Sequence, residues 1–135
     1  DCRPALAGAS PAVEVLDNPD WAEGMATSVQ IGVAAASALG AAAIVVGLAD
    51  QPGVGADAWR TVADAAADRP IVVAEYDGRR GNPVRLAASV WSELPTTGDE
   101  GARALMARRS DLVAAVACPG DASDVDTVED LARWI

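Results

Sequence analysis

Acidic side chains follow two of the apolar runs that the sequence predicts to be strands. Asp50 comes just after the run 44–48, and Asp124 and Asp126 come after the run 112–118. The strands of a parallel sheet end at the same edge, so these carboxylates are expected to share that edge. Two carboxylates together with substrate phosphate oxygens are a usual way to hold Mg²⁺. The placement therefore indicates that the acids at the two strand ends could share one metal ion.

Each acid also has a structural explanation. Asp50 precedes Gln51 and Pro52, and an Asp at the end of a strand commonly starts a turn by bonding to the backbone. For Asp50 taken alone, the turn is the better explanation. Asp126 lies three residues before Glu129, which is the spacing of a helix cap. For Asp126, metal binding and capping explain the spacing equally well.

The charge balance and the missing residue types exclude several classes of function. Acidic residues outnumber basic ones by 20 to 10, and the net charge is −10. This charge argues against nucleic acid and anionic membrane surfaces as partners. All ten basic residues are Arg, and His is absent. Imidazole acid–base chemistry, His metal ligation and lysine Schiff bases are therefore excluded within this chain.

Cysteine usage and hydropathy favour a cytoplasmic protein. Cys2 and Cys118 form neither a disulfide framework nor a zinc pattern, and Cys118 is predicted to be a buried thiol. No apolar segment is long enough to cross a bilayer as a helix, and no signal peptide is visible. Because the chain begins without Met, we also expect a fragment or a processed chain.

Predicted strands and helices alternate along the chain. The expected strands are 12–16, 44–48, 71–74 and 112–118, with a hairpin-type turn at 76–81 and an extended segment at 83–86. The expected helices are 25–39, 56–67, 87–94 and 98–109, with a last helix after 127. This alternation predicts one α/β domain with a three-layer, mostly parallel sheet and a small hairpin insertion. The β-branched run at 44–48 is expected to be buried on both faces.

Two helix starts carry polar signals. Thr27 and Ser28 lie in a first helical turn, where free N–H groups favour an anion; a capped helix start explains them equally well. Thr97 and Glu100 have capping-box spacing, which predicts a helix from about residue 98. In the helix 56–67, the side chains expected to face inward are Trp59, Val62, Ala63 and Ala66.

Five segments in order resemble the motifs of a known family. They read NPDWAEGMATS (18–28), GLADQPGV (47–54), YDGRRGNPV (76–84), TGDEGARAL (97–105) and DVDTVEDL (124–131). They are similar to successive motifs of the MobA/MocA-like molybdenum-cofactor nucleotidyltransferases. The resemblance implies a Rossmann-like sheet. It also implies transfer of a nucleoside monophosphate from CTP or GTP to the phosphate of molybdopterin, with release of pyrophosphate.

The resemblance also implies roles for individual residues. Asp50 matches the family's Mg²⁺-binding acid, and Asp126, with Asp124 beside it, matches the pair before the last helix; Asp50 and Asp126 would be the catalytic pair. The side facing the pterin and the loop beside the site would be formed by Asn18, Gly24, Ser28, Gly81, Asn82, Pro83, Asp99 and Arg103. Further candidate phosphate contacts are Arg79, Arg80 and Arg85, for which a solvated surface position is the alternative.

The sequence departs from the family pattern in several places. Ala49 stands where glycine is usual, Asn82 replaces a histidine common in the cytidylyl branch, and Val128 replaces a proline. Nothing in residues 1–17 matches the family's first strand and glycine-rich loop. Residues 1–135 are therefore expected to be the C-terminal portion of the domain. We expect an unpaired flank on the strand at 44–48 or at Ala12, and weak binding of CTP·Mg²⁺.

The resulting expectation is a Mg²⁺-dependent cytidylyltransferase that makes the cytosine dinucleotide form of the molybdenum cofactor. Its partners would be CTP and molybdopterin, with a molybdoenzyme as recipient. Guanylyl transfer from GTP is the alternative within the family. A non-catalytic domain that binds or delivers the cofactor is the alternative from another class.

Overall fold

The computed structural model describes residues 4, 8 and 13–135. The first predicted strand is wrong in the part that can be compared, because residues 13–16 have no regular secondary structure. Its first residue, Ala12, lies outside the described residues. A run of alternating apolar residues needs a partner strand to become a strand, and this segment pairs with none among the described residues.

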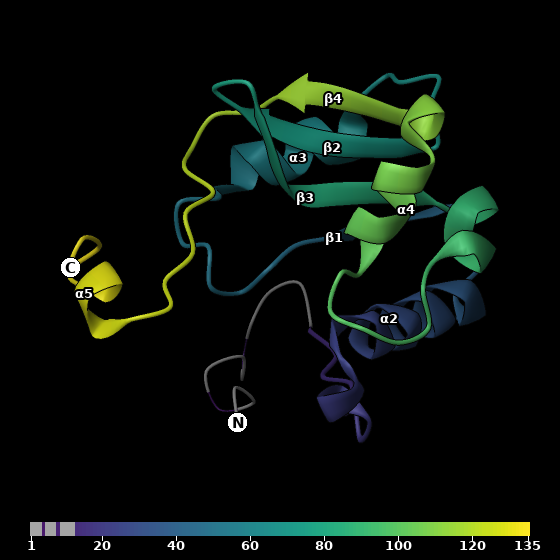
Figure 1. Cartoon of the computed structure of the whole chain (residues 1–135), viewed down its shortest axis with the longest axis horizontal. Coiled ribbons are helices and arrows are strands. Elements are labelled where there is room, and N and C mark those ends of the chain that lie inside the picture. Colours follow the sequence, from purple (N-terminus) through teal and green to yellow (C-terminus); the bar gives the residue numbers. More distant parts are fainter. Residues whose placement is uncertain (1–3, 5–7, 9–12) are drawn as a thin grey trace.

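The described residues form one four-stranded sheet in the order β1-β3-β2-β4 (Figure 1). The strands are β1 (Ala43–Val46), β2 (Ile71–Tyr76), β3 (Arg79–Ala87) and β4 (Val113–Ala117). β3 is antiparallel to both β1 and β2, and β2 is parallel to β4. Three strands therefore run in one direction, as expected, and β3 runs against them.

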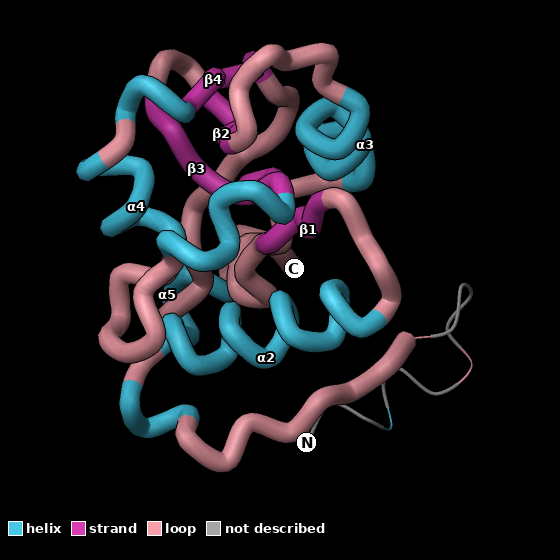
Figure 2. The backbone as a smooth tube through the Cα atoms, turned by 90° about the vertical axis from the view of Figure 1, so that its right-hand side faces the viewer, coloured by secondary structure: helices cyan, strands magenta, loops and turns pink. Residues whose placement is uncertain are grey.

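Helices cover both faces of this sheet. The α-helices are α2 (Met25–Ala38), α3 (Ala56–Asp64), α4 (Ala102–Arg108) and α5 (Val128–Leu131). Within the described residues, the 3₁₀ turns are η1 (Trp21–Glu23), η2 (Ala88–Glu93) and η3 (Ser110–Leu112). Figure 2 shows α3 on one side of the strands and α4 on the other, with α2 beneath β1. This confirms the three-layer α/β fold. No helix in the described part of the chain has the length and apolar character needed to cross a membrane.

β2 is the centre of the core because its apolar side chains alternate between the two faces. Ile71 and Val73 pack in the cluster with α2, η2 and α4, and Val72 and Ala74 pack in the cluster with α3. β1, in contrast, is only half-buried along its length. It lies at the edge of the sheet, and within the described residues its one partner is β3. The expected burial of this strand on both faces is therefore met only in part, since Ile44 and Val46 pack against one core cluster and Val45 against the other. The expected unpaired flank is present as far as the described residues show.

The predicted hairpin turn is present between β2 and β3. Asp77 and Gly78 both have left-handed φ angles, of 48° and 80°, which is the backbone of the two-residue turns that join antiparallel strands. β3 then continues for nine residues into the sheet, so the hairpin is part of the main sheet and not a small insertion. The register with β2 shifts between Val73 and Ala74.

Two helix predictions need correction. α4 begins at Ala102 after Gly101, without a side-chain cap, so the expected capping box of Thr97 and Glu100 does not form. The backbone of Gly98 instead bonds to the start of α2. In α3 the buried residues are Ala58 and Val62, whereas Trp59 is 37% exposed because its ring lies over Gly47 at the sheet edge.

Candidate active site

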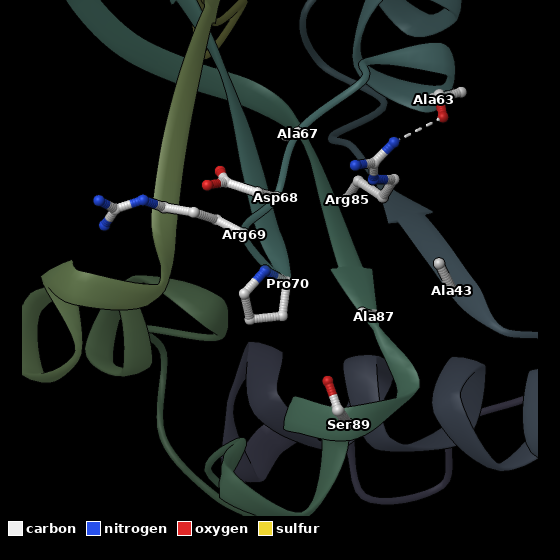
Figure 3. A pocket seen from close by; sticks show the side chains of 9 residues that line it. All are labelled: Ala43, Ala63, Ala67, Asp68, Arg69, Pro70, Arg85, Ala87 and Ser89. Carbon is white, nitrogen blue, oxygen red and sulfur yellow. Dashed lines mark hydrogen bonds between the residues drawn. The ribbon is translucent and has the colours of Figure 1, made fainter.

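Two hollows lie at opposite ends of the sheet. The larger one, of about 550 Å³, lies where β1 and β2 begin, and we call it the amino-end hollow. It is lined by Ala43, Ala63, Ala67, Asp68, Arg69, Pro70, Arg85, Ala87 and Ser89 (Figure 3). The smaller one, of about 380 Å³, lies toward the ends of the same strands, and we call it the carboxyl-end cavity.

The arginines of the amino-end hollow are already bonded to the protein backbone. Arg85 Nη1 donates to the carbonyls of Ala63 and Ala65, at 2.9 Å each, and Figure 3 shows the first of these bonds. Arg69 donates to the carbonyl of Asp111. These guanidinium groups stabilise the end of α3 and the turn before β4, so they are not free for a ligand.

The carboxyl-end cavity combines an apolar wall with charged side chains. Its lining comes from the sheet, from the start of α2 and from the loop into α4: Met25, Val29, Val46, Leu48, Val73, Arg80, Gly81, Asn82, Val84, Asp99, Glu100, Ala102, Arg103, Met106 and Ala107. Of the predicted site residues, the structure thus brings Gly81, Asn82, Asp99 and Arg103 together here.

Two arginines at this cavity remain free. Arg80 and Arg103 are exposed, and within the described part of the chain neither guanidinium has a hydrogen-bond or ion-pair partner. A free guanidinium presents paired N–H donors that match phosphate oxygens. An apolar wall beside free guanidinium groups suits a flat ring that carries a phosphate.

The wall that carries Asp99 and Glu100 is held against α2 by two glycines. The Ala26 N–H donates to the Gly98 carbonyl at 2.9 Å, and the Gly98 N–H donates to the Glu23 carbonyl at 2.9 Å. Gly24 is buried with φ 109°, and a Cβ there would overlap the backbone of Gly98. Gly24 is therefore a support for the cavity wall and not part of its lining.

Asn18 and Ser28 also have supporting positions. Asn18 Nδ2 donates to Thr27 Oγ1 and to Ser28 Oγ, at 2.8 Å each. Thr27 Oγ1 in turn donates to the carbonyl of Gly24 at 2.8 Å. The structure gives these side chains intramolecular partners, although α2 itself begins after Gly24 without a side-chain cap.

Asn82 and Pro83 lie in β3 where its register with β2 shifts, beside the carboxyl-end cavity. Asn82 lines the cavity, and Pro83 is buried after a cis peptide bond. Tyr76 Oη donates to the Asn82 carbonyl at 2.7 Å. Burial raises the pKa of Tyr76, and the nearby Cys118 adds to this shift, so the hydroxyl stays protonated and keeps this bond. Cys118 itself is half-buried, so the expected buried thiol is found only in part.

The acidic strand ends meet through their backbones. The Val125 N–H donates to the Asp50 carbonyl at 2.8 Å, so Asp126 follows directly after a residue bonded to Asp50. In Figure 1 the segments after β1 and after β4 run at the same end of the sheet. Leu48 lines the carboxyl-end cavity and precedes Asp50 by two residues, so the loop that carries Asp50 begins at this cavity. A Cβ on Gly81 would instead meet Ala122 and the Tyr76 ring, which pack on the α3 side of the sheet.

Asp126 does not cap the last helix. The cap of α5 is Thr127, which forms a capping box with Asp130. The hydrogen bond from Thr127 lowers the pKa of Asp130. Asp50 and Asp126 are both exposed, and neither carboxylate has a partner among the described residues. These two carboxylates have the donor chemistry of an open Mg²⁺ site that substrate phosphate oxygens would complete.

Asp124 differs from these two acids. Its Oδ1 accepts a hydrogen bond of 2.7 Å from Gln51 Nε2. Within the described residues, no three acidic or cysteine side chains gather closely enough to hold a metal ion. The three predicted ligands therefore do not form a preformed cluster. Sequence reasoning missed Gln51, although its place next to Asp50 in a strand-end loop was a signal.

Comparison with known proteins agrees with this architecture. The chain superposes on Rv0371c from Mycobacterium tuberculosis H37Rv with a TM-score of 0.74 and 26% identity, over 98% of this chain and 70% of that one. It also superposes on the Rv0371c homologue from Mycobacterium sp. strain JC1 with a TM-score of 0.56 and 26% identity, over 76% of this chain and 55% of that one. No curated protein matches the sequence significantly. The model of the MobA-like NTP transferase domain matches residues 2–113, and the chain therefore belongs to the MobA-like NTP transferase family.

Proposed function

We propose that this chain takes part in Mg²⁺-dependent transfer of CMP from CTP to the phosphate of molybdopterin. The observation that carries the proposal is the carboxyl-end cavity, where an apolar wall lies beside Arg80 and Arg103, neither of which has a partner among the described residues, and where Leu48 leads into the loop of Asp50. A pterin ring would lie on the wall formed by Met25 and Leu48. Its phosphate would face Arg80 and Arg103, where each charged hydrogen bond contributes about 1.5–3 kcal/mol.

The proposed reaction places few demands on acid–base groups. A phosphate oxygen of molybdopterin attacks the α-phosphorus of CTP, the bond to the β-phosphate breaks, and pyrophosphate leaves. The attacking oxygen is already ionised, so positioning and charge neutralisation dominate the catalysis. This suits a chain without His or Lys.

Asp50 and Asp126 would hold the metal in this proposal. Bound Mg²⁺ supplies charge neutralisation on the phosphates. The contribution of the chain is to keep the two carboxylates at one edge. The bond from the Val125 N–H to the Asp50 carbonyl would hold the two segments together. Because Thr127 caps α5, the Asp126 carboxylate is not used as a helix cap.

The test is a transfer assay on the complete protein with α-labelled CTP or GTP, Mg²⁺ and molybdopterin. We expect labelled dinucleotide product and pyrophosphate with CTP, and loss of both in Asp50→Asn. Product with GTP instead would show the guanylyl alternative. Binding of molybdopterin that needs Arg103 but yields no product with either nucleotide would indicate a binding or delivery domain.

A further inference from the structure

Gln51 is the one polar or charged side chain that is buried among the described residues, with 9% of its surface exposed. Its Nε2 donates two hydrogen bonds, to the Ala122 carbonyl at 3.0 Å and to Asp124 Oδ1 at 2.7 Å. Both acceptors belong to the segment that precedes Asp126. A single amide group therefore connects the loop after β1 with the loop after β4.

The other end of this amide has no partner. Gln51 Oε1 is buried and accepts no hydrogen bond from any described residue. An unsatisfied buried acceptor lowers the free energy of unfolding. An apolar side chain of similar size would avoid this cost. A glutamine at this position is explained by the two hydrogen bonds that its N–H₂ group donates to the segment after β4.

Backbone contacts lie on both sides of Gln51. The Val125 N–H bonds to the Asp50 carbonyl at 2.8 Å, and the Asp121 N–H bonds to the Gly53 carbonyl at 3.2 Å. Gly53 has no room for a side chain, because a Cβ there would overlap the Asp121 carbonyl and the Trp134 ring. The two segments are therefore in close contact over several residues, with the Gln51 amide between the two backbone bonds.

We propose that Gln51 is a positioning residue that holds the segment 121–126 against Asp50 by donating to Ala122 and Asp124. The consequence for the proposed metal site, which rests on the proposed function, is a division of roles between the neighbouring acids. Asp124 accepts from Gln51 and fixes the segment. Asp126 keeps a free carboxylate for the metal.

The proposed role requires a hydrogen-bond donor at position 51, and a polar side chain that only accepts would not fulfil it. Glu at position 51 would present oxygen to two acceptors and place a negative charge beside Asp124. Met would remove both donors without adding charge, and would also remove the unsatisfied oxygen. Gln30 offers a matched control, because its Nε2 also donates to a backbone carbonyl, that of Pro95, at 3.0 Å.

Hydrogen exchange tests the positioning role directly. We expect Gln51→Glu and Gln51→Met to speed exchange of the Asp121 and Val125 amides by about tenfold or more. Exchange in β2 should stay unchanged. The double substitution Gln51→Glu/Asp124→Asn reverses donor and acceptor and should slow the exchange again. Gln30→Glu should leave both amides as in the unmodified protein.

Two results would overturn the positioning role. One is unchanged exchange at Asp121 and Val125 in both Gln51 variants. The other is a uniform rise in exchange across the sheet with a lower melting temperature, because Gln51 would then support the fold as a whole.

Metal binding is the second measurement. With Mn²⁺ as probe in the presence of CTP, we expect Gln51→Met to raise the half-saturating Mn²⁺ concentration by about tenfold at a nearly unchanged melting temperature. An unchanged value would overturn the link between Gln51 and the metal. Absence of Mn²⁺ binding in the unmodified protein would instead contradict the proposed function, while the exchange measurements would still decide the role of Gln51.

Discussion

The two hollows at opposite ends of the sheet differ in what their arginines do. The amino-end hollow is the larger, at about 550 Å³ against about 380 Å³. Its Arg85 and Arg69 are bonded to backbone carbonyls, whereas Arg80 and Arg103 at the carboxyl-end cavity have no partner among the described residues. The proposed function therefore rests on the arginines that have no partner among the described residues and not on the size of the hollow.

The same contrast holds for the acids. At the carboxyl end of the sheet, Asp50 and Asp126 have no partners among the described residues, although Thr127, Asp130 and Gln51 nearby are all hydrogen-bonded. Two carboxylates without partners among bonded neighbours are consistent with the metal site that we propose. Four measurements can break or sharpen this comparison.

The largest effect is expected for Asp50→Asn. Asparagine keeps the shape and the turn-forming ability but removes the charge, so turnover should fall at least about a hundredfold. Circular dichroism should show an intact fold. Asp57→Asn is the control, because Asp57 is an exposed α3 residue paired with Arg60 at 3.1 Å. Normal turnover with normal Mg²⁺ dependence would make Asp50 a turn former only.

The next effect concerns the wall of the carboxyl-end cavity. Gly24→Ala should lower the free energy of unfolding by roughly 2–4 kcal/mol, because the new Cβ overlaps Gly98 and the φ of Gly24 is unfavourable for alanine. Gly40, which precedes β1, also has a positive φ, of 68°, but open space around it. Gly40→Ala should therefore cost only about 1–2 kcal/mol. Urea denaturation of both variants measures the difference, and equal losses would show that Gly24 does not support the wall.

A pair of arginine substitutions compares the two hollows directly. Arg103→Gln should raise KM for the phosphorylated pterin about tenfold without changing the free energy of unfolding. Arg85→Gln should do the reverse, lowering the free energy of unfolding by about 1–2 kcal/mol and leaving KM unchanged. Steady-state kinetics and urea denaturation of both variants provide the test. A higher KM in Arg85→Gln would assign the ligand to the amino-end hollow.

The smallest effect is expected when the pH is lowered. Hydrogen bonds from Ser123 and Thr127 lower the pKa of Asp121 and Asp130. A carboxyl whose pKa is lowered in the folded state stabilises that state above its unfolded pKa of about 3.9. This contribution is lost as the pH falls through the folded pKa. NMR signals of the Ser123 and Thr127 amides should therefore shift below about pH 4. The Ser123 amide should lose this transition in Asp121→Asn, and a transition that persists there would contradict the assignment.

The types of α2 and β2 followed from local sequence, whereas the strand predicted at 12–16 did not form over residues 13–16 and the burial of β1 was not predicted correctly. The apolar periodicity of 25–39 predicted α2, and the β-branched run at 71–74 predicted β2, because these patterns depend on neighbouring residues alone. β1 is only half-buried because it lies at the edge of the sheet, with β3 as its one partner within the described residues. Strand order depends on pairing between distant segments, which no local pattern records.

The sequence by itself determined that acids follow two strand ends, that His and Lys chemistry is absent, and where α2, β2 and β4 lie. Only the tertiary structure decided which polar groups remain free. Among the described residues, Asp126 has no partner because Thr127 caps α5, and Arg103 has none, whereas Arg85 donates to the carbonyls of Ala63 and Ala65. The physical reason is that a hydrogen bond depends on distance and direction between atoms far apart in the chain, and these are fixed only when the layers pack.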